Sequence, residues 1–332
     1  MTFVCIIWLK LCIIILNWNY VKGVANTNEK FRITGVITVL AEETVLLPPL
    51  IQRGCYLPVM MILKHSKSST EKPDQTTMRV ITDLHRKNSG YGENDGWYTG
   101  IWEGECAFDR RKPDHISTHK VWYLKHERTK HIITSQFKAY MDTIRMLMYI
   151  ELVVAEYMRD ANLTEFFLWM DNYAAHNTVA VQRMLEKYSI LTPFYPPNMT
   201  PYLQICDLVV NAPIKRKERT LRAERTYEAF QTYREQYELL SHEDKKKSKF
   251  KPGRPQLEDG IRDVLAMFDG GGDFRNAKFE AGLTRCFIKT GCVPRTEGGN
   301  IKTSRYITRV LEHGEETLFH FQCCLLMMWK LF

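Results

Sequence analysis

Two aspartates stand at positions where protein folds commonly place metal ligands. Asp171 directly follows the apolar run FFLWM (166–170), which has no polar face and is typical of a strand buried on both sides. A gap of 35 residues separates it from Asp207, which lies near the start of a long helical segment (206–240). Ligands of open α/β sheets bind beyond the carboxyl ends of central strands, and a helix start tolerates an acid well. The spacing therefore predicts that both carboxylates converge on a divalent cation, which prefers oxygen ligands.

The hydrophobic pattern indicates the elements that must position this pair. Apolar runs rich in β-branched or aromatic residues predict strands at 31–43, 57–64, 165–170 and 189–197. Apolar residues at helical spacing predict one helix from Ser135 to about Met158 and another from Asn177 to Lys187. The segment 206–240 is expected to be amphipathic, with an inner face of Leu208, Ile214, Leu221, Phe230, Tyr237 and Leu240. Strands first, then strand and helix alternating, predict an α/β fold with a mixed sheet flanked by helices.

The composition is that of a globular protein, and the positive charge is concentrated in one region. Apolar residues make up 45% and charged residues 25% of the 332 residues, which is enough for a buried core. The net charge is +8, and residues 215–254 alone hold 13 Lys or Arg against 7 Asp or Glu. Such a stretch predicts an anionic partner. The candidate nucleic-acid-binding residues are Lys215, Arg216, Lys217, Arg219, Lys245, Lys246 and Lys247.

The beginning of the chain conflicts with its cysteine usage. Residues 3–16 form a short apolar block ahead of GVA, a pattern that predicts either a secretion signal or a stretch foreign to the gene. Lys10 interrupts the block, which is too short to span a bilayer, so no membrane partner is expected. The nine scattered cysteines favour a reduced compartment. Because the far end, FQCCLLMMWKLF, is equally apolar, both ends are interpreted as aberrant.

The motifs around both aspartates resemble the DDE superfamily endonuclease domain of mariner/pogo-like (Tigger/jerky-type) transposases. That family carries an Asp-Asn-x-x-x-His motif after a central strand, and this sequence has Asp171, Asn172 and His176 there. A second family motif, Pro-Pro-Asn-x-Thr…Leu-Gln-Pro-x-Asp, leads to Asn-x-Pro-x-Lys. The residues that match it in order are Pro196, Pro197, Asn198, Thr200, Leu203, Gln204, Asp207, Asn211, Pro213 and Lys215.

The resemblance covers about residues 30–240 and implies an RNase H-like fold with Mg²⁺- or Mn²⁺-dependent phosphodiester chemistry on DNA. It makes Asp171 and Asp207 the second and third acids of a catalytic triad and its metal ligands. The residues that it places in supporting roles are Asn172, His176, Asn198 and Gln204. A purely structural turn at the end of the strand, with a histidine whose hydrogen-bonding groups are satisfied, explains Asn172 and His176 equally well. DNA is the partner implied, and self-association into a homo-oligomer is left open.

The departures from the family pattern decide what activity to expect. The family's first acid lies on the first strand, but residues 1–28 contain no Asp or Glu, and Ile205 replaces the proline before the third acid. We expect that the first strand is lost, or replaced by the apolar block, in a chain truncated at its N-terminus relative to the family. Strand cleavage is then inactive or nearly so. The alternative is a non-catalytic DNA-binding or interaction protein on the same scaffold, so enzymatic activity stays open.

These expectations divide the chain into an apolar N-terminus, an RNase H-like domain with a polar insertion, a basic linker, a helical C-terminal extension and a tail. The boundaries are 1–28, 29–240 with the insertion at 65–130, 241–256, 257–310 and 311–332. In the linker, KKKSK (245–249) predicts nuclear import, and secretion is the alternative from the apolar block. The triplet Gly253, Arg254 and Pro255 resembles the core of an AT-hook, although a charged linker explains the same composition.

Overall fold

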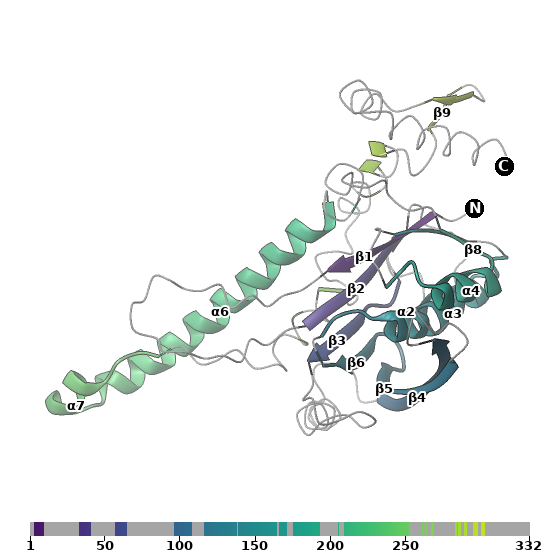
Figure 1. Ribbon diagram of the computed structural model, residues 1–332. Coiled ribbons are helices and arrows are strands. Elements are labelled where there is room, and N and C mark those ends of the chain that lie inside the picture. The colour runs from purple at the N-terminus through teal and green to yellow at the C-terminus, as the bar shows by residue number, and fades with distance from the viewer. Residues whose placement is uncertain are drawn as a thin grey trace.

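One mixed sheet forms the centre of the protein (Figure 1). The computed structural model describes residues 3–9, 33–40, 57–64, 96–107, 116–137, 139–164, 166–170, 175–192, 205, 209–251, 261, 263, 267–268, 283, 285–286, 289–290, 295–297 and 300–302. The described strands of this sheet are β1 (Phe3–Leu9), β2 (Ile33–Leu40), β3 (Met60–Lys64), β4 (Trp97–Ala107), β5 (Ile116–His126), β6 (Ile132–Gln136), β7 (Phe166–Trp169) and β8 (Ile190–Leu191). They lie in the order β4-β5-β6-β3-β2-β1-β7-β8.

Five of these strands have the RNase H-like arrangement. β1 pairs antiparallel with β2, and β2 pairs antiparallel with β3. On the other side, β1 pairs parallel with β7, and β7 pairs parallel with β8. An antiparallel meander whose first strand is central, followed by two parallel strands, is the RNase H-like order. The predicted fold class is therefore confirmed, and a strand is found in each predicted range.

The apolar N-terminal block supplies the first strand of this arrangement. β1 has the sequence FVCIIWL and lies between β2 and β7. A run of apolar and aromatic residues suits a central strand, which has neighbours on both edges. The apolar block therefore occupies the position of the first strand, and truncation relative to the family stays a prediction.

The described part of the polar segment 65–130 extends the same sheet. β4 and β5 pair antiparallel along their whole lengths, β5 pairs with β6, and β6 joins β3 in parallel. Trp102 on β4 is buried, and a Cβ on Gly104 would lie only 2.0 Å from its ring. The glycine therefore leaves the space that this indole fills.

The first predicted helix, for which Ser135 was the expected cap, begins seven residues later than expected. Ser135 pairs with Leu63 in the sheet, so it cannot cap a helix. Asp142 is the cap, and its side chain accepts the backbone N–H of Arg145 at 2.9 Å. The helical segments that follow are α2 (Thr143–Tyr149), the π-helical η1 (Ile150–Val154) and α3 (Ala155–Asp160). The second predicted helix is confirmed as α4 (Val179–Lys187), which Thr178 caps.

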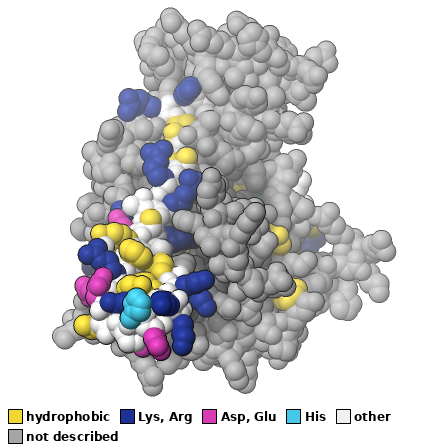
Figure 2. Space-filling model, turned by 90° about the vertical axis from the view of Figure 1, so that its left-hand side faces the viewer, with side chains coloured by type: hydrophobic (Ala, Val, Ile, Leu, Met, Phe, Trp, Pro, Cys, Tyr) yellow, Lys and Arg dark blue, Asp and Glu magenta, His cyan; other side chains and the backbone are white. Residues whose placement is uncertain are grey.

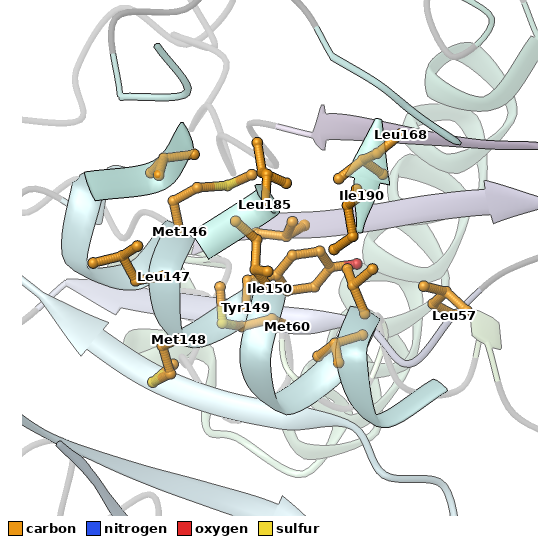
Figure 3. Packing of buried hydrophobic residues seen from close by; sticks show 14 of the residues in the cluster. Leu57, Met60, Met146, Leu147, Met148, Tyr149, Ile150, Leu168, Leu185 and Ile190 are labelled. Atoms are coloured by element: carbon orange, nitrogen blue, oxygen red, sulfur yellow. The ribbon is translucent and has the colours of Figure 1, made fainter. Parts of the chain in front are cut away.

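The core lies between these helices and the sheet (Figure 3). Side chains of α2, η1 and α4 pack there against residues of β3, β7 and β8. Tyr149 is fully buried, and its hydroxyl shares a 2.6 Å hydrogen bond with the Thr38 hydroxyl of β2. Burial raises the pKa of this tyrosine far above its usual value. The helices that frame the carboxyl edge of β7 are thus fixed by both apolar packing and a buried polar contact.

The long helix α6 (Asn211–Glu238) projects away from the sheet, and α7 (His242–Lys247) lies at its far end (Figure 1). Among the described residues of its predicted inner face, only Ile214 is buried, whereas Phe230 and Leu240 are 40% and 37% exposed. The expectation of an amphipathic helix packed along its length is therefore wrong, because the helix leaves the body after its first turns. Pro213 lies in the first turn, as predicted.

The C-terminal extension contains a small sheet in addition to helix. The described residues between 261 and 290 are helical, but β9 (Arg295–Glu297) and β10 (Asn300–Lys302) form an antiparallel pair. The sequence between the two strands is Gly-Gly, a common hairpin signal that the expectation of a helical extension did not use. Across the described part of the chain, no helix combines the length and apolar character needed to cross a membrane.

Candidate functional site

The strand that should present Asp171 is found where the sequence predicts it. Within β7, Phe166 and Leu168 are buried, and at its end Trp169 and the bridge residue Met170 are buried as well. The chain reaches Asp171 directly after this anchored segment. Asp171, together with Asn172, Asn198, Gln204 and Asp207, lies outside the described residues. The convergence of the two acids stays a prediction.

The neighbouring strand offers no carboxylate. β1 runs parallel to β7, and Cys5 is paired with Trp169. All seven residues of β1 are apolar, so the strand that carries the first acid in the resembled family has no oxygen ligand here. Among the residues whose placement is described, no three His, Cys, Asp or Glu side chains are grouped so as to hold a metal ion. Asp171 and Asp207 are therefore the only acids that the sequence predicts as ligands of the metal site.

His176 lies in the turn between β7 and α4 and is fully buried. Its backbone carbonyl accepts the Gln182 side-chain N–H at 3.3 Å, which ties the turn to α4. A buried imidazole at this place fits either a supporting role beside Asp171 or a purely structural one. Ile205, which stands where the family pattern has proline, is buried as well.

Two other carboxylates near the sheet are already engaged in packing. Glu151 accepts the Trp102 indole N–H at 2.8 Å and the Tyr188 hydroxyl at 3.0 Å. Glu156 pairs with Lys125, which is 4% exposed on β5. These contacts fasten the helices to the extended part of the sheet, so neither carboxylate is a candidate ligand.

A partly buried histidine lies at the outer end of the sheet. Ser117 and His119 share a 2.8 Å hydrogen bond on β5. Burial, reinforced by the Arg145 guanidinium, lowers the pKa of His119, while burial raises the pKa of Cys106. A thiol that stays protonated at neutral pH gives Cys106 little nucleophilic capacity.

The predicted nucleic-acid-binding residues all fall on α6 and α7. Arg216 and Arg219 are exposed near the base of α6, and Lys246 and Lys247 are exposed on α7. Lys217 is half-buried, and the side chain of Lys215 is outside the described set. The two groups are therefore brought onto one projecting arm, although at its opposite ends.

Part of the charge on α6 is sorted by side. At about 100° per residue, Arg219 and Arg222 lie within about 60° of each other. On the opposite side lie the acids Glu224, Glu228 and Glu235, all exposed, together with the half-buried Lys217. We call the side of α6 that carries Arg219 and Arg222 the basic side of the arm.

Near the α7 end of the arm, an aromatic cluster holds the segment after α7 against the basic side of α6. Phe250 packs against Phe230 and Tyr233, with ring centroids 5.1 and 5.4 Å apart. Tyr237 extends the cluster, and the Lys245 ammonium lies 5.6 Å from its ring centroid. Tyr237 lies 18 residues, or about five turns, after Arg219 and so faces the same way. The cluster therefore places Lys245 on the basic side.

The resulting surface is long rather than compact (Figure 2). Lys and Arg side chains gather over α6 and α7 on the face shown, with apolar side chains between them. From Arg219 to Tyr237 the helix rises about 27 Å. Phe230 and Tyr237 were expected on a buried inner face, and the i, i+3, i+7 spacing of Phe230, Tyr233 and Tyr237 was the signal for the cluster.

The middle of α6 forms an ion pair that sequence reasoning did not find. Arg225 of α6 binds both carboxylate oxygens of Asp263, which is 6% exposed. This bidentate contact joins the arm to the C-terminal extension.

One comparison with known proteins agrees with part of the resemblance. Residues 115–247 match the model of the DDE superfamily endonuclease family. No curated protein matches the chain significantly. Among solved structures, the chain is similar to a chain in the cryo-EM structure of the simian T-cell lymphotropic virus intasome in complex with PP2A regulatory subunit B56 gamma, at 9% identity and a TM-score of 0.21. That match covers 63% of this chain and 57% of the other, and at such a TM-score it carries no argument.

Proposed function

We propose that this chain is a DNA-binding protein derived from a DDE-type transposase endonuclease, with strand cleavage lost or nearly so. One observation carries the proposal: a chain whose residues 115–247 match an endonuclease family has a central strand, β1, without a carboxylate. The match supports the ancestry, and the composition of β1 removes the first of three acids. Without the carboxylate that bridges two metal ions, water and phosphodiester are not aligned for in-line attack.

The remaining acids suit Mg²⁺ or Mn²⁺ by their donor chemistry. Asp171 and Asp207 would supply carboxylate oxygens, the ligands that these hard cations prefer. When bound, the ion would polarise a phosphate oxygen. The buried residues at the end of β7, Trp169 and Met170, restrict where the chain can present Asp171. His176 packs inside the turn that follows and would brace it.

DNA is the anion that best fits the arm. The basic side of α6 and α7 extends over about 27 Å, which corresponds to about eight base pairs at 3.4 Å each. Contacts from Arg216, Arg219, Lys246 and Lys247 along this length suit a regular polyphosphate backbone better than a compact anion. We also propose a nuclear location, which KKKSK supports.

The test of DNA binding is fluorescence anisotropy with a 30-base-pair duplex at several salt concentrations. We expect Kd to rise steeply with salt, and the double variant Lys246→Ala/Lys247→Ala to reduce the slope of log K against log salt by about 1.8. Lys120→Ala is the matched control, because Lys120 is an exposed lysine on β5 that pairs with Glu103, away from the arm. A parent chain that fails to bind at low salt, or a control that weakens binding as much, would refute the proposal.

The missing first acid can be tested by restoring it. Ile7 lies two residues past the Cys5–Trp169 pair, and Asp171 lies two residues past Trp169. Ile7→Asp is therefore expected to increase Mn²⁺ affinity in calorimetry, and Asp171→Ala or Asp207→Ala should abolish that gain. Ile6→Asp is the control, because alternate strand residues face opposite sides of a sheet. Plasmid cleavage by the parent chain with Mn²⁺ would show that the chemistry survives without the first acid.

A further inference from the structure

Ser248 differs from the other described serines in its surroundings. It follows Lys245, Lys246 and Lys247, and Lys249 and Lys251 come after it. Four of these five lysines are exposed, and no residue of α7 is buried. The half-buried serine therefore lies in a strongly positive environment, on a part of the arm where most neighbouring side chains are exposed.

The backbone changes from helix to extended conformation at this residue. Ser248 is the C-cap of α7, with φ −77° and ψ 130°, and residues 249–251 are not helical. Its hydroxyl shares a 3.0 Å hydrogen bond with the Tyr233 hydroxyl of α6. Because α7 has only six residues, releasing this contact exposes the serine at small cost.

We propose that Ser248 is a phosphorylation site for a protein kinase that selects basic residues around its acceptor, and that the modification weakens binding of DNA to the arm. Ser248 Oγ forms a bond to the γ-phosphorus of ATP while the bond from that phosphorus to the β,γ-bridging oxygen breaks. ADP leaves, and the hydroxyl proton passes to the kinase base. Complementary charge between kinase and substrate favours this serine over those in acidic or neutral stretches.

The modification would act on the same surface as DNA. A phosphoserine carries about −1.5 to −2 charges at pH 7, which offsets one to two of the surrounding lysines. It also replaces the hydroxyl that Tyr233 holds, and so loosens the segment that brings Lys249 and Lys251 onto α6. The loss of one to two phosphate contacts predicts a weakening of about 8- to 60-fold at 0.1 M salt. This consequence rests on the proposed DNA binding, whereas the site itself does not.

Ser241 provides an internal control. It caps the other end of α7, where its hydroxyl accepts the Asp244 backbone N–H and donates to the Asp244 carboxylate at 2.6 Å. Glu243 and Asp244 follow it in sequence. Both serines thus share one short exposed helix but have opposite electrostatic surroundings.

The experiment incubates the full chain with ATP and a purified kinase that selects basic substrates, and maps the product by mass spectrometry. We expect phosphate on Ser248 and not on Ser241, loss of incorporation in Ser248→Ala but not in Ser241→Ala, and a two- to tenfold faster rate in Tyr233→Phe. Anisotropy with the 30-base-pair duplex then compares the phosphorylated and unmodified chains.

Each outcome decides a separate point. Incorporation elsewhere, or at an equal rate on Ser241, overturns the site. Phosphate on Ser248 without a change in Kd for DNA overturns the regulatory role. If the unmodified chain does not bind DNA, the proposed function and the regulatory role fail together, while the mass spectrum still establishes or refutes the site.

Discussion

The ion pair between Lys125 and Glu156 offers a quantitative test of how the sheet extension is joined to the helices. Lys125 lies on β5 with its side chain 5% exposed, and Glu156 lies on α3 at 24%. The ammonium also approaches the Leu152 carbonyl at 3.5 Å. Breaking a buried pair by removing one partner costs about 3–5 kcal/mol, because the other charge is left without compensation. Since Glu156 retains partial contact with water, we expect Glu156→Gln to cost about 3 kcal/mol.

The reverse change and the double change separate charge from packing. Lys125→Met leaves a carboxylate that can regain water, so we expect a smaller loss of about 1–2 kcal/mol. The double variant Lys125→Met/Glu156→Leu should lie within about 1 kcal/mol of the parent, because both charges are removed. Urea unfolding followed by tryptophan fluorescence measures all of these values, assuming one cooperative transition.

The chain contains a matched control for this measurement. Lys120 and Glu103 form an ion pair between the same two kinds of residue on β5 and β4, but their side chains are 61% and 52% exposed. Glu103→Gln should cost less than about 1 kcal/mol. If Glu156→Gln costs no more than this control, burial does not govern the pair and the reasoning is refuted. If the double variant is as unstable as the worse single variant, lost packing explains the effect instead.

Three further predictions concern other parts of the described structure. Gly104→Ala forces a methyl group against the Trp102 ring and should lower the free energy of unfolding by about 1–3 kcal/mol in urea, whereas an unchanged midpoint would show that the ring can move. The lowered pKa of His119 means that the unfolded chain binds more protons below pH 6.5, so stability should fall as pH decreases from 7 to 5, and by less in His119→Gln; equal losses would exclude this histidine as a source. Burial raises the pKa of Cys286 to about 11 against the opposing effect of Lys289, so its alkylation at pH 8 should be at least about a hundredfold slower in the folded chain than in urea, which peptide mass spectrometry can measure.

Local sequence patterns were sufficient for the fold class and for four of the eight described strands of the large sheet, namely β2, β3, β7 and β8. The run FFLWM forms β7 because a short segment without a polar face is stable only where neighbours cover both of its sides. The start of α2 was misplaced because Ser135 is an adequate helix cap in isolation. Its pairing with Leu63 of β3, a residue 72 positions earlier, takes it into the sheet instead.

The candidate site divides in the same way. Its residue types, their order and the absence of an acid from β1 follow from the sequence alone, since a motif needs only spacing and a missing carboxylate needs only composition. The sequence also indicated that α6 and α7 are basic. It could not show that Phe250 folds back on Phe230 and Tyr233, because contacts between residues distant in the chain depend on where a helix leaves the core.

By itself, then, the sequence determined which chemical groups are present. It has one aspartate directly after a buried strand and another near the start of a long helix, a first strand without an acid, and a concentration of lysine and arginine. Only the tertiary structure decided where that chemistry lies. It placed the apolar N-terminal block between β2 and β7 of the sheet, extended α6 away from the body and brought Lys245 of α7 against Tyr237. Periodicity records which side of an element is apolar, but the partner that covers that side is chosen by packing across the whole chain.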